Sequence, residues 1–291
     1  MSTAPLVAIT GAHGWVGRRL AAYFEAHGWR VRRLVRHPQP EAVECHEAAP
    51  FVLGQPVLPI ALAGAQAVVH AAYDFTLLKP ADLERVNVAG AQALWAAAEA
   101  AQVPQRVLIS TMSAYPGARS LYGQTKLAME RDAQARGALV VRPGLVWGAE
   151  AGGMYGSLQR QVQGGRLLPL IGGGGQVLHL VHEEDLGALV FHYAAGGFPR
   201  PGEPVTAAHP APWTFRQILE EIARRQGRPT PHFLPVPWRA VWLALKSAET
   251  LGLPLGFRSD SLVSLMHQNA VPDFTIPAGS GWQPRAYGAT A

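Results

Sequence analysis

Tyr122 and Lys126 are the residues whose types and spacing most directly suggest chemistry. They lie four positions apart in Tyr-Gly-Gln-Thr-Lys, which places both on one face of a helix. A free tyrosine has a pKa of about 10 and is a poor base near neutral pH, but a nearby ammonium stabilises its phenolate. We therefore expect Lys126 to lower the pKa of Tyr122, so that the phenol can exchange a proton with an alcohol. Thr111, at the carboxyl end of an expected strand, is expected to hydrogen-bond the reacting oxygen.

Lysine is rare in this chain, which makes Lys126 conspicuous. Lysine and arginine together number 25, and only three of these residues are lysines. An isolated Tyr-x-x-x-Lys pattern is common and usually carries no meaning. Here one of three lysines falls four residues after a tyrosine, downstream of a nucleotide-binding motif, so we interpret the pair as catalytic.

A glycine-rich segment near the N-terminus predicts a dinucleotide site. Gly11, Gly14 and Gly17 follow the apolar run 6–10 in Thr-Gly-x-x-Gly-x-x-Gly, and a helical pattern follows them. Glycine lets the backbone approach a pyrophosphate, whose charge is met by free N–H groups at a helix N-terminus. The expected cofactor site also includes three other residues of this loop, His13, Trp15 and Val16. For His13, local loop structure is the simpler explanation.

The end of the next apolar run, 31–35, indicates which dinucleotide binds. An acidic residue there would bind the 2′-hydroxyl of NAD, whereas this chain has Arg36, nineteen positions after Gly17. Arginine can bind a 2′-phosphate bidentately, so we predict a preference for NADP(H). NAD stays possible, because an arginine on the surface or stacked on adenine would also explain Arg36.

The elements that must position these residues alternate between strand and helix over the first 140 residues. Strands are expected at 6–10, 31–35, 67–72, 106–110 and 138–142, and helices at 18–25, 82–101 and 121–136. This alternation predicts an α/β fold, a Rossmann-type doubly wound parallel sheet with a smaller, mostly helical C-terminal substrate domain. We assign 1–148 to the dinucleotide-binding domain, to which 176–195 returns, and 149–175 and 196–291 to the substrate-binding part.

A stripe of large side chains at helical spacing lies near the C-terminus. It predicts a helix whose stripe lies in the core or forms the wall of a substrate pocket, with a membrane-surface helix as the weaker alternative. The stripe consists of Trp238, Val241, Trp242, Leu245 and Ala248.

The composition excludes several classes of protein. Of 291 residues 48% are hydrophobic and 15% charged, which is too apolar for a disordered chain. No stretch approaches the roughly 20 apolar residues of a membrane span, so no stable membrane insertion is expected. The first residues lack the charged start of an export signal, and the lone Cys45 fits a reducing cytoplasm. The chain is basic, but its arginines are scattered, so we do not expect nucleic-acid binding.

Six short segments, in this order, resemble the extended short-chain dehydrogenase/reductases, a group that includes the NAD-dependent epimerase/dehydratase family. They are Thr-Gly-x-x-Gly-x-x-Gly (10–17), Val-His-Ala-Ala (69–72), Asn-Val-Ala-Gly (87–90), Ile-Ser-Thr (109–111), Tyr-x-x-x-Lys (122–126) and Arg-Pro-Gly (142–144). The resemblance implies Tyr122 as the acid/base, Lys126 as the group that holds the nicotinamide ribose, and Thr111 as the group that polarises the substrate oxygen.

The resemblance also extends the expected cofactor site along the chain and implies a possible homodimer through the helices 82–101 and 121–136. Asn87 would support the cofactor site or a water relay. The cofactor residues added in this way are His70, Ala71, Ala72, Asn87, Tyr122, Lys126, Pro143, Gly144, Leu145 and Val146.

Two departures from the family pattern bear on the substrate. Met112 and Ser113 stand where sugar dehydratases have an Asp-Glu pair, so we exclude sugar dehydration. Leu178 stands where nucleotide-sugar epimerases commonly carry an arginine for the diphosphate, and an unmet diphosphate is costly to bind. We therefore expect an apolar or weakly charged small-molecule substrate.

The leading hypothesis is an NAD(P)-dependent oxidoreductase that interconverts a secondary alcohol and a ketone. The alternatives are a nucleotide-sugar epimerase with tightly bound NAD and a non-catalytic dinucleotide-binding subunit. His179, His182, Glu183 and Asp185 could form a metal cluster, but the family resemblance implies that they lie at a strand-to-helix junction, where acidic residues suit the first helical turn. No metal site is expected.

Overall fold

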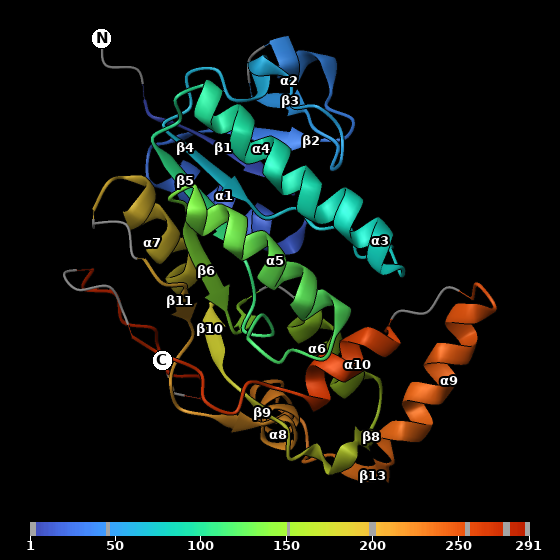
Figure 1. The fold of residues 1–291 in the computed structure, drawn as a ribbon. Helices are drawn as coiled ribbons and strands as arrows, with labels where there is room; N and C mark the ends of the chain where they lie inside the picture. The colour runs from blue at the N-terminus through green and yellow to red at the C-terminus, as the bar shows by residue number, and fades with distance from the viewer. Residues whose placement is uncertain are drawn as a thin grey trace.

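A seven-stranded parallel sheet forms the centre of the protein (Figure 1). The computed structural model describes residues 4–44, 47–149, 152–197, 202–253, 257–275 and 280–288, so Cys45 lies outside the described residues. The strands lie in the order β11-β6-β5-β4-β1-β2-β3, with bounds β1 Leu6–Thr10, β2 Arg30–Val35, β3 Ala48–Pro50, β4 Ala67–His70, β5 Gln105–Ile109, β6 Leu139–Pro143 and β11 Val205–Ala207.

The strand order reverses between β1 and β4, where Thr10 pairs with His70. Doubly wound sheets bind their ligands beyond the carboxyl ends of the strands at this switch point. The predicted Rossmann-type fold is therefore confirmed, and its topology places the glycine-rich loop after β1 at the expected binding edge.

Helices cover both faces of the sheet (Figure 1). The buried residues of α1 (Trp15–Ala26) and α7 (Glu183–Ala194) pack with Val7 and Ile9 of β1, and those of α4 (Ala89–Ala100) and α5 (Leu121–Ala135) pack with Leu6 and Ala8. All four side chains are buried, as expected for a parallel strand covered on both faces. These two apolar layers hold the strand ends, and with them the candidate site, in fixed relative positions.

The helix expected at 82–101 is interrupted by a wider turn. It consists of α3 (Pro80–Leu83), one π-helical turn (η2, Glu84–Val88) and α4. The π-turn contains Asn87, which is fully buried and accepts a hydrogen bond from the amide of Asp74 at 2.7 Å. Apolar periodicity alone does not detect a single widened turn, although such turns are frequent at functional sites.

The C-terminal part has its own buried cluster, built on α6 (Gly153–Gly164) and α8 (Phe215–Arg225). Three two-stranded pairs frame it: β7 (Leu145–Trp147) with β10 (Leu180–His182), β9 (Val177–Leu178) with β12 (Trp213–Thr214), and β8 (Leu167–Ile171) with β13 (His232–Val236). The sequence-based division differs from the structure at two points. It assigned all of 196–291 to the substrate-binding part, whereas β11 pairs with β6 as the outer strand of the main sheet. It returned 176–195 to the dinucleotide-binding domain, whereas Leu178 of β9 and Leu180 of β10 belong to the C-terminal cluster.

The remaining elements are short or lie at the edge of the fold. The sequence did not predict α2 (Pro40–Glu44) or η1 (Pro59–Ala61), whereas the run of four glycines from Gly172 predicts a turn, and the structure has the turn η3 (Gly172–Gly174) there. The expected C-terminal helix is α9 (Trp238–Thr250), which projects away from the sheet and precedes α10 (Ser259–Met266) (Figure 1). The predicted stripe of α9 is only half-buried, Leu243 beside it is exposed, and no residue of α9 belongs to the core. The described residues include no helix that is both long and apolar enough to span a bilayer.

Candidate functional site

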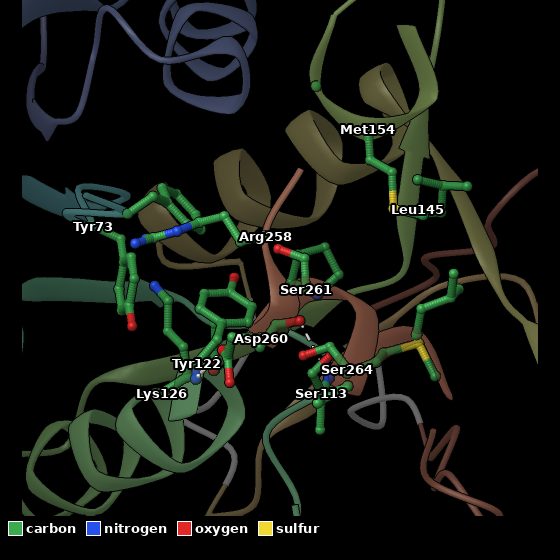
Figure 2. Close-up of a pocket in the computed structure, with 18 of the residues that line it drawn as sticks. Tyr73, Ser113, Tyr122, Lys126, Leu145, Met154, Arg258, Asp260, Ser261 and Ser264 are labelled. Carbon is green, nitrogen blue, oxygen red and sulfur yellow. Dashed lines mark hydrogen bonds between the residues drawn. The ribbon is translucent and has the colours of Figure 1, made fainter. Parts of the chain in front are cut away.

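A cavity of about 760 Å³ lies at the carboxyl ends of β1, β4, β5 and β6, and its far wall comes from α9 and α10. Figure 2 shows Tyr73, Tyr122 and Lys126 on one side of it, with Met154 and Leu145 on the other. The predicted site residues that line it are Gly11, Gly14, Trp15, Val16, Gly17, Ala71, Thr111, Tyr122, Lys126, Pro143, Gly144, Leu145 and Val146. The predicted residues that do not line it are His13, Arg36, His70, Ala72 and Asn87.

The glycine-rich loop leaves room and donors for an anionic group. Gly11 has φ +66°, and a Cβ there would lie 2.8 Å from the amide nitrogen of Ala72. A Cβ on Gly17 would collide with the carbonyl oxygen of Gly11. The helix α1 starts without a side-chain cap, and no acceptor among the described residues takes the first amides, those of Trp15 and Val16. Free amides beside a close-packed glycine turn fit a pyrophosphate.

His70 lies in the core and shapes the turn after β4. Thr10 Oγ1 accepts hydrogen bonds from the amides of Ala71 and Ala72 at 3.1 and 3.2 Å, which leaves its proton for His70 Nδ1 at 2.7 Å. Burial, helped by the charge of Lys126, lowers the pKa of His70 to about 3, so the ring is neutral. The structure thus places this side chain behind the cavity and only the backbone of Ala71 in its wall.

Arg36, just after β2, differs in its contacts from the two arginines inside that strand. Arg32 is buried and donates to the carbonyl oxygens of Ile60 and Ala63, and Arg33 pairs with Glu25 at 2.6 Å. Arg36 is exposed, and among the described residues no hydrogen bond or ion pair holds its guanidinium. It lies outside the cavity wall but at the edge where the expected cofactor site begins. His13 is likewise exposed.

Tyr122 sits in the first turn of α5, and its side chain lines the cavity together with Thr111. Burial raises the pKa of the Tyr122 phenol above its ordinary value, an effect opposed by a hydrogen bond with Thr111 and reinforced by Tyr73. The phenol therefore keeps its proton at neutral pH. In this state it can donate that proton to a substrate oxygen.

Lys126 follows on the same face of α5, as the spacing predicts, but its contacts differ from the expectation. Its Nζ donates to the carbonyl oxygen of Ile109 at 2.9 Å and lies 5.1 Å from the centroid of the Tyr73 ring. Burial lowers its own pKa to about 8. The expected lowering of the Tyr122 pKa by Lys126 is therefore wrong for this structure, because burial outweighs any stabilisation of the phenolate.

Sequence reasoning missed an aromatic cluster around the phenol. The rings of Tyr73 and Tyr122 are perpendicular with centroids 5.1 Å apart, and the Phe75 ring lies 5.5 Å from Tyr122. Both neighbours belong to the loop after β4, which Asn87 ties down through Asp74. The only signal in the sequence was Asn87 itself, since nothing in the spacing links 73–75 to 122.

Away from the glycine loop the cavity has many apolar lining residues, and α9, α10 and the segment between them add charged ones: Lys246, Glu249, Arg258 and Asp260. Leu178 and Met112, the two positions on which the expectation of an apolar substrate rests, both line it. The further apolar lining residues are Phe75, Leu77, Leu78, Leu145, Met154, Val177, Trp242, Phe257, Val263 and Leu265. The half-buried stripe of α9 thus contributes to a pocket wall through Trp242.

The acidic residues near His182 serve a helix terminus. Glu183, Glu184 and Asp185 occupy the first turn of α7, and His182 is its N-cap, which confirms the expected strand-to-helix junction. Glu183 also lies 3.3 Å from Arg19. Across the described ranges, no three His, Cys, Asp or Glu side chains gather in a way that could hold a metal ion.

Comparisons with known proteins agree with this architecture. The model of the NAD dependent epimerase/dehydratase family matches residues 7–198. No curated protein matches the sequence. Among solved structures, gox2253 has a TM-score of 0.70 at 19% identity and covers 98% of this chain and 94% of its own.

Two further solved structures share this fold. MoeE5 in complex with UDP-glucose and NAD has a TM-score of 0.63 at 20% identity, over 90% of this chain and 96% of its own. The UDP-N-acetylglucosamine 4-epimerase from Bacillus cereus has a TM-score of 0.65 at 18% identity, over 90% of this chain and 97% of its own. At these identities the likeness establishes the fold.

Proposed function

Since the chain belongs to the NAD-dependent epimerase/dehydratase family of enzymes, we propose that it is an NAD(P)-dependent oxidoreductase that interconverts a secondary alcohol and a ketone. One observation carries the proposal. A protonated phenol, a hydroxyl and a buried ammonium, on Tyr122, Thr111 and Lys126, line the same cavity as an uncapped helix N-terminus with a close-packed glycine turn. A site that only bound a dinucleotide would not need that trio.

The cofactor residues divide by the part of the dinucleotide that each would hold. The amides of Trp15 and Val16 would bind the pyrophosphate, and Lys126 would bind the nicotinamide ribose. A bound nicotinamide cofactor supplies hydride chemistry at the substrate carbon. The role of Asn87 in the cofactor site would be indirect, because its side chain fixes the loop that carries Tyr73.

Proton transfer in the reduction direction falls to Tyr122. Its phenol donates the proton to the ketone oxygen, and the Thr111 hydroxyl donates a second hydrogen bond to that oxygen as negative charge develops. The ammonium of Lys126, 2.9 Å from the carbonyl oxygen of Ile109, provides positive charge on the same side of the cavity. In the oxidation direction the phenolate of Tyr122, the form that is left after that donation, accepts the alcohol proton.

The cavity wall favours an apolar or weakly charged substrate over a nucleotide sugar. Each phosphate charge would need a partner in the site, and Leu178 and Met112 offer none. A nucleotide-sugar epimerase with tightly bound NAD remains the second candidate because two cations of the far wall line the cavity. Arg258 donates to the backbone carbonyls of Thr76 and Leu77, and Lys246 lies 3.7 Å from Glu249. MoeE5, of the same fold, binds UDP-glucose and NAD.

The purified protein decides between these candidates. With a panel of bulky apolar ketones, we expect oxidation of NAD(P)H that depends on the ketone, and little cofactor retained after desalting. Inversion of a UDP-sugar by protein that retains NAD would favour the epimerase. A stable complex with a partner protein, with no turnover of the ketones or of a UDP-sugar, would favour a non-catalytic subunit.

We further propose that NADP(H) is preferred, because Arg36, the exposed arginine just after β2, makes no hydrogen bond or ion pair within the described residues and interacts only through its charge with Asp74. A bidentate bond between charged groups contributes about 1.5–3 kcal/mol, so NADPH should bind roughly 10- to 100-fold more tightly than NADH. Arg36→Ala should reduce that ratio to about threefold or less. Fluorescence titration of both cofactors measures it, and Arg33→Ala, which removes the neighbouring ion pair with Glu25, is the control. Equal affinities in the parent protein would refute the preference.

A further inference from the structure

Asp260 connects α10 to the start of the helix that carries Tyr122. Its Oδ1 accepts a hydrogen bond from the amide of Leu121 at 2.7 Å, and its Oδ2 accepts one from the amide of Tyr122 at 2.9 Å. These are the first two amides of α5, which have no partner inside the helix. Figure 2 shows Asp260 and Ser264 of α10 beside Tyr122.

The same face of α10 also holds the cap of α5. Ser120 Oγ accepts from the amide of Gly123 at 3.1 Å, and Ser264 Oγ donates to Ser120 Oγ at 2.7 Å. The first three amides of α5 are therefore satisfied by Asp260 directly or by a serine that α10 contacts. The turn that contains Tyr122 depends on a helix almost 140 residues away in the sequence.

The segment around Asp260 is itself anchored on two other walls of the cavity. The amide and hydroxyl of Ser259 donate to the two carboxylate oxygens of Glu249 on α9, at 2.8 and 2.7 Å. The Arg258 guanidinium donates to the carbonyl oxygens of Thr76 and Leu77, at 3.2 and 3.3 Å. Residues 258–264 thus join α9, the loop after β4 and α5.

We infer that Asp260 is a positioning residue for Tyr122, an inference that rests on the proposed role of Tyr122 in proton transfer. Terminal helical turns fray, and Tyr122 occupies the first turn of α5. Two hydrogen bonds to one charged carboxylate fix the rotation of this turn and therefore the path of the phenol to the substrate oxygen. A misplacement of about 1 Å at a reacting group can lower a rate by about 100-fold.

The arrangement also ties substrate contact to the placement of the phenol. Ser261 and Val263, on either side of Leu262 in α10, line the cavity together with Asp260. A substrate that packs against this helix contacts the same element that holds the Tyr122 amide. The substrate-binding part of the protein thereby stabilises the catalytic geometry of the Rossmann part.

The test compares Asp260→Asn and Asp260→Ala with the parent protein. We expect kcat to fall about 10-fold in Asp260→Asn, which keeps one acceptor oxygen without the charge, and about 100-fold in Asp260→Ala. The KM for the ketone and the Kd for NADPH should stay within about threefold. Hydrogen exchange at the amides of Leu121 and Tyr122 should be at least tenfold faster in both variants. This second readout needs no substrate.

Asp273→Asn is the matched control, because Asp273 is an exposed aspartate in the same C-terminal segment, and its hydrogen bonds within the described residues go to Thr275 in its own turn. Unchanged exchange at the amides of Leu121 and Tyr122 in Asp260→Ala would show that Asp260 does not hold this turn. Faster exchange with unchanged kcat, or a change confined to KM, would overturn the positioning role. A failure of the proposed function has a different signature: turnover would survive Tyr122→Phe, while the amide exchange would still respond to Asp260. If Asp260→Ala does not fold, the near-isosteric Asp260→Asn carries the test.

Discussion

Tyr122→Phe is expected to lower turnover by about 10²–10⁴-fold, the usual contribution of a positioned general acid, with the Kd for NADPH within about twofold. The variant loses only the phenolic hydroxyl, whose pKa burial raises, and it keeps the ring that packs against Tyr73 and Phe75. Steady-state oxidation of NAD(P)H with a ketone and fluorescence titration of the cofactor measure the two effects separately.

Tyr73→Phe is the matched control for that variant. Burial raises the pKa of Tyr73 to about 12, and its ring lies against that of Tyr122, so it is a second phenol in the same cavity. We expect loss of the Tyr73 hydroxyl to change turnover by less than about fivefold. The reason is that Thr111, the proposed second donor to the substrate oxygen, is hydrogen-bonded to Tyr122. If Tyr73→Phe abolishes turnover and Tyr122→Phe does not, the two phenols have exchanged roles and the proposed mechanism is wrong.

Lys126→Met is expected to remove most turnover and, at the same time, to change how stability depends on pH. In the folded protein burial lowers the pKa of Lys126 to about 8, from 10.5 in an exposed lysine. Between these values the unfolded chain binds more protons than the folded one, so the free energy of unfolding of the parent rises with pH there. The penalty for burying the charge is fully present below pH 8 and disappears as the pH approaches 10.5.

Methionine carries no charge, so the advantage of Lys126→Met over the parent should shrink as the pH rises. The difference in unfolding free energy, variant minus parent, is expected to fall by about 2 kcal/mol between pH 8 and pH 10. Any constant effect of losing the hydrogen bond to Ile109 cancels in this comparison. Urea unfolding at several pH values measures it, with Lys79→Met as the control for removing one lysine. A pH-independent difference would show that Lys126 is not buried with a lowered pKa.

Local spacing was sufficient to predict the Rossmann half of the fold. The apolar runs around 6–10, 67–72 and 106–110 became β1, β4 and β5, because a parallel strand buried on both faces must be apolar throughout. The glycine motif was equally readable: the turn at Gly11 and the collision that a Cβ at Gly17 would cause are local backbone requirements. Tyr122 and Lys126 share a face of α5 because they lie one helical turn apart.

Non-local contacts were not readable in the same way. Asp260 and Tyr122 meet only through tertiary packing, and the pKa of Tyr122 depends on burial that no spacing predicts. The π-turn at Asn87 and the outer strand β11 also depend on pairing partners distant in the chain. The dimer through the helices at 82–101 and 121–136, and the cytoplasmic location, stay predictions.

Deuterium transfer tests the central claim most directly. The protein is incubated with NADPH that carries deuterium at the transferable C4 position and with a bulky apolar ketone, and the product is analysed by mass spectrometry. We predict an alcohol with one deuterium per molecule, formed at similar rates by the parent and by Asp273→Asn and about 10²–10⁴-fold more slowly by Tyr122→Phe. Alcohol without deuterium, or deuterium transfer by Tyr122→Phe at the parent rate, would contradict this mechanism, as would inversion of a UDP-sugar by retained NAD with no transfer to any ketone.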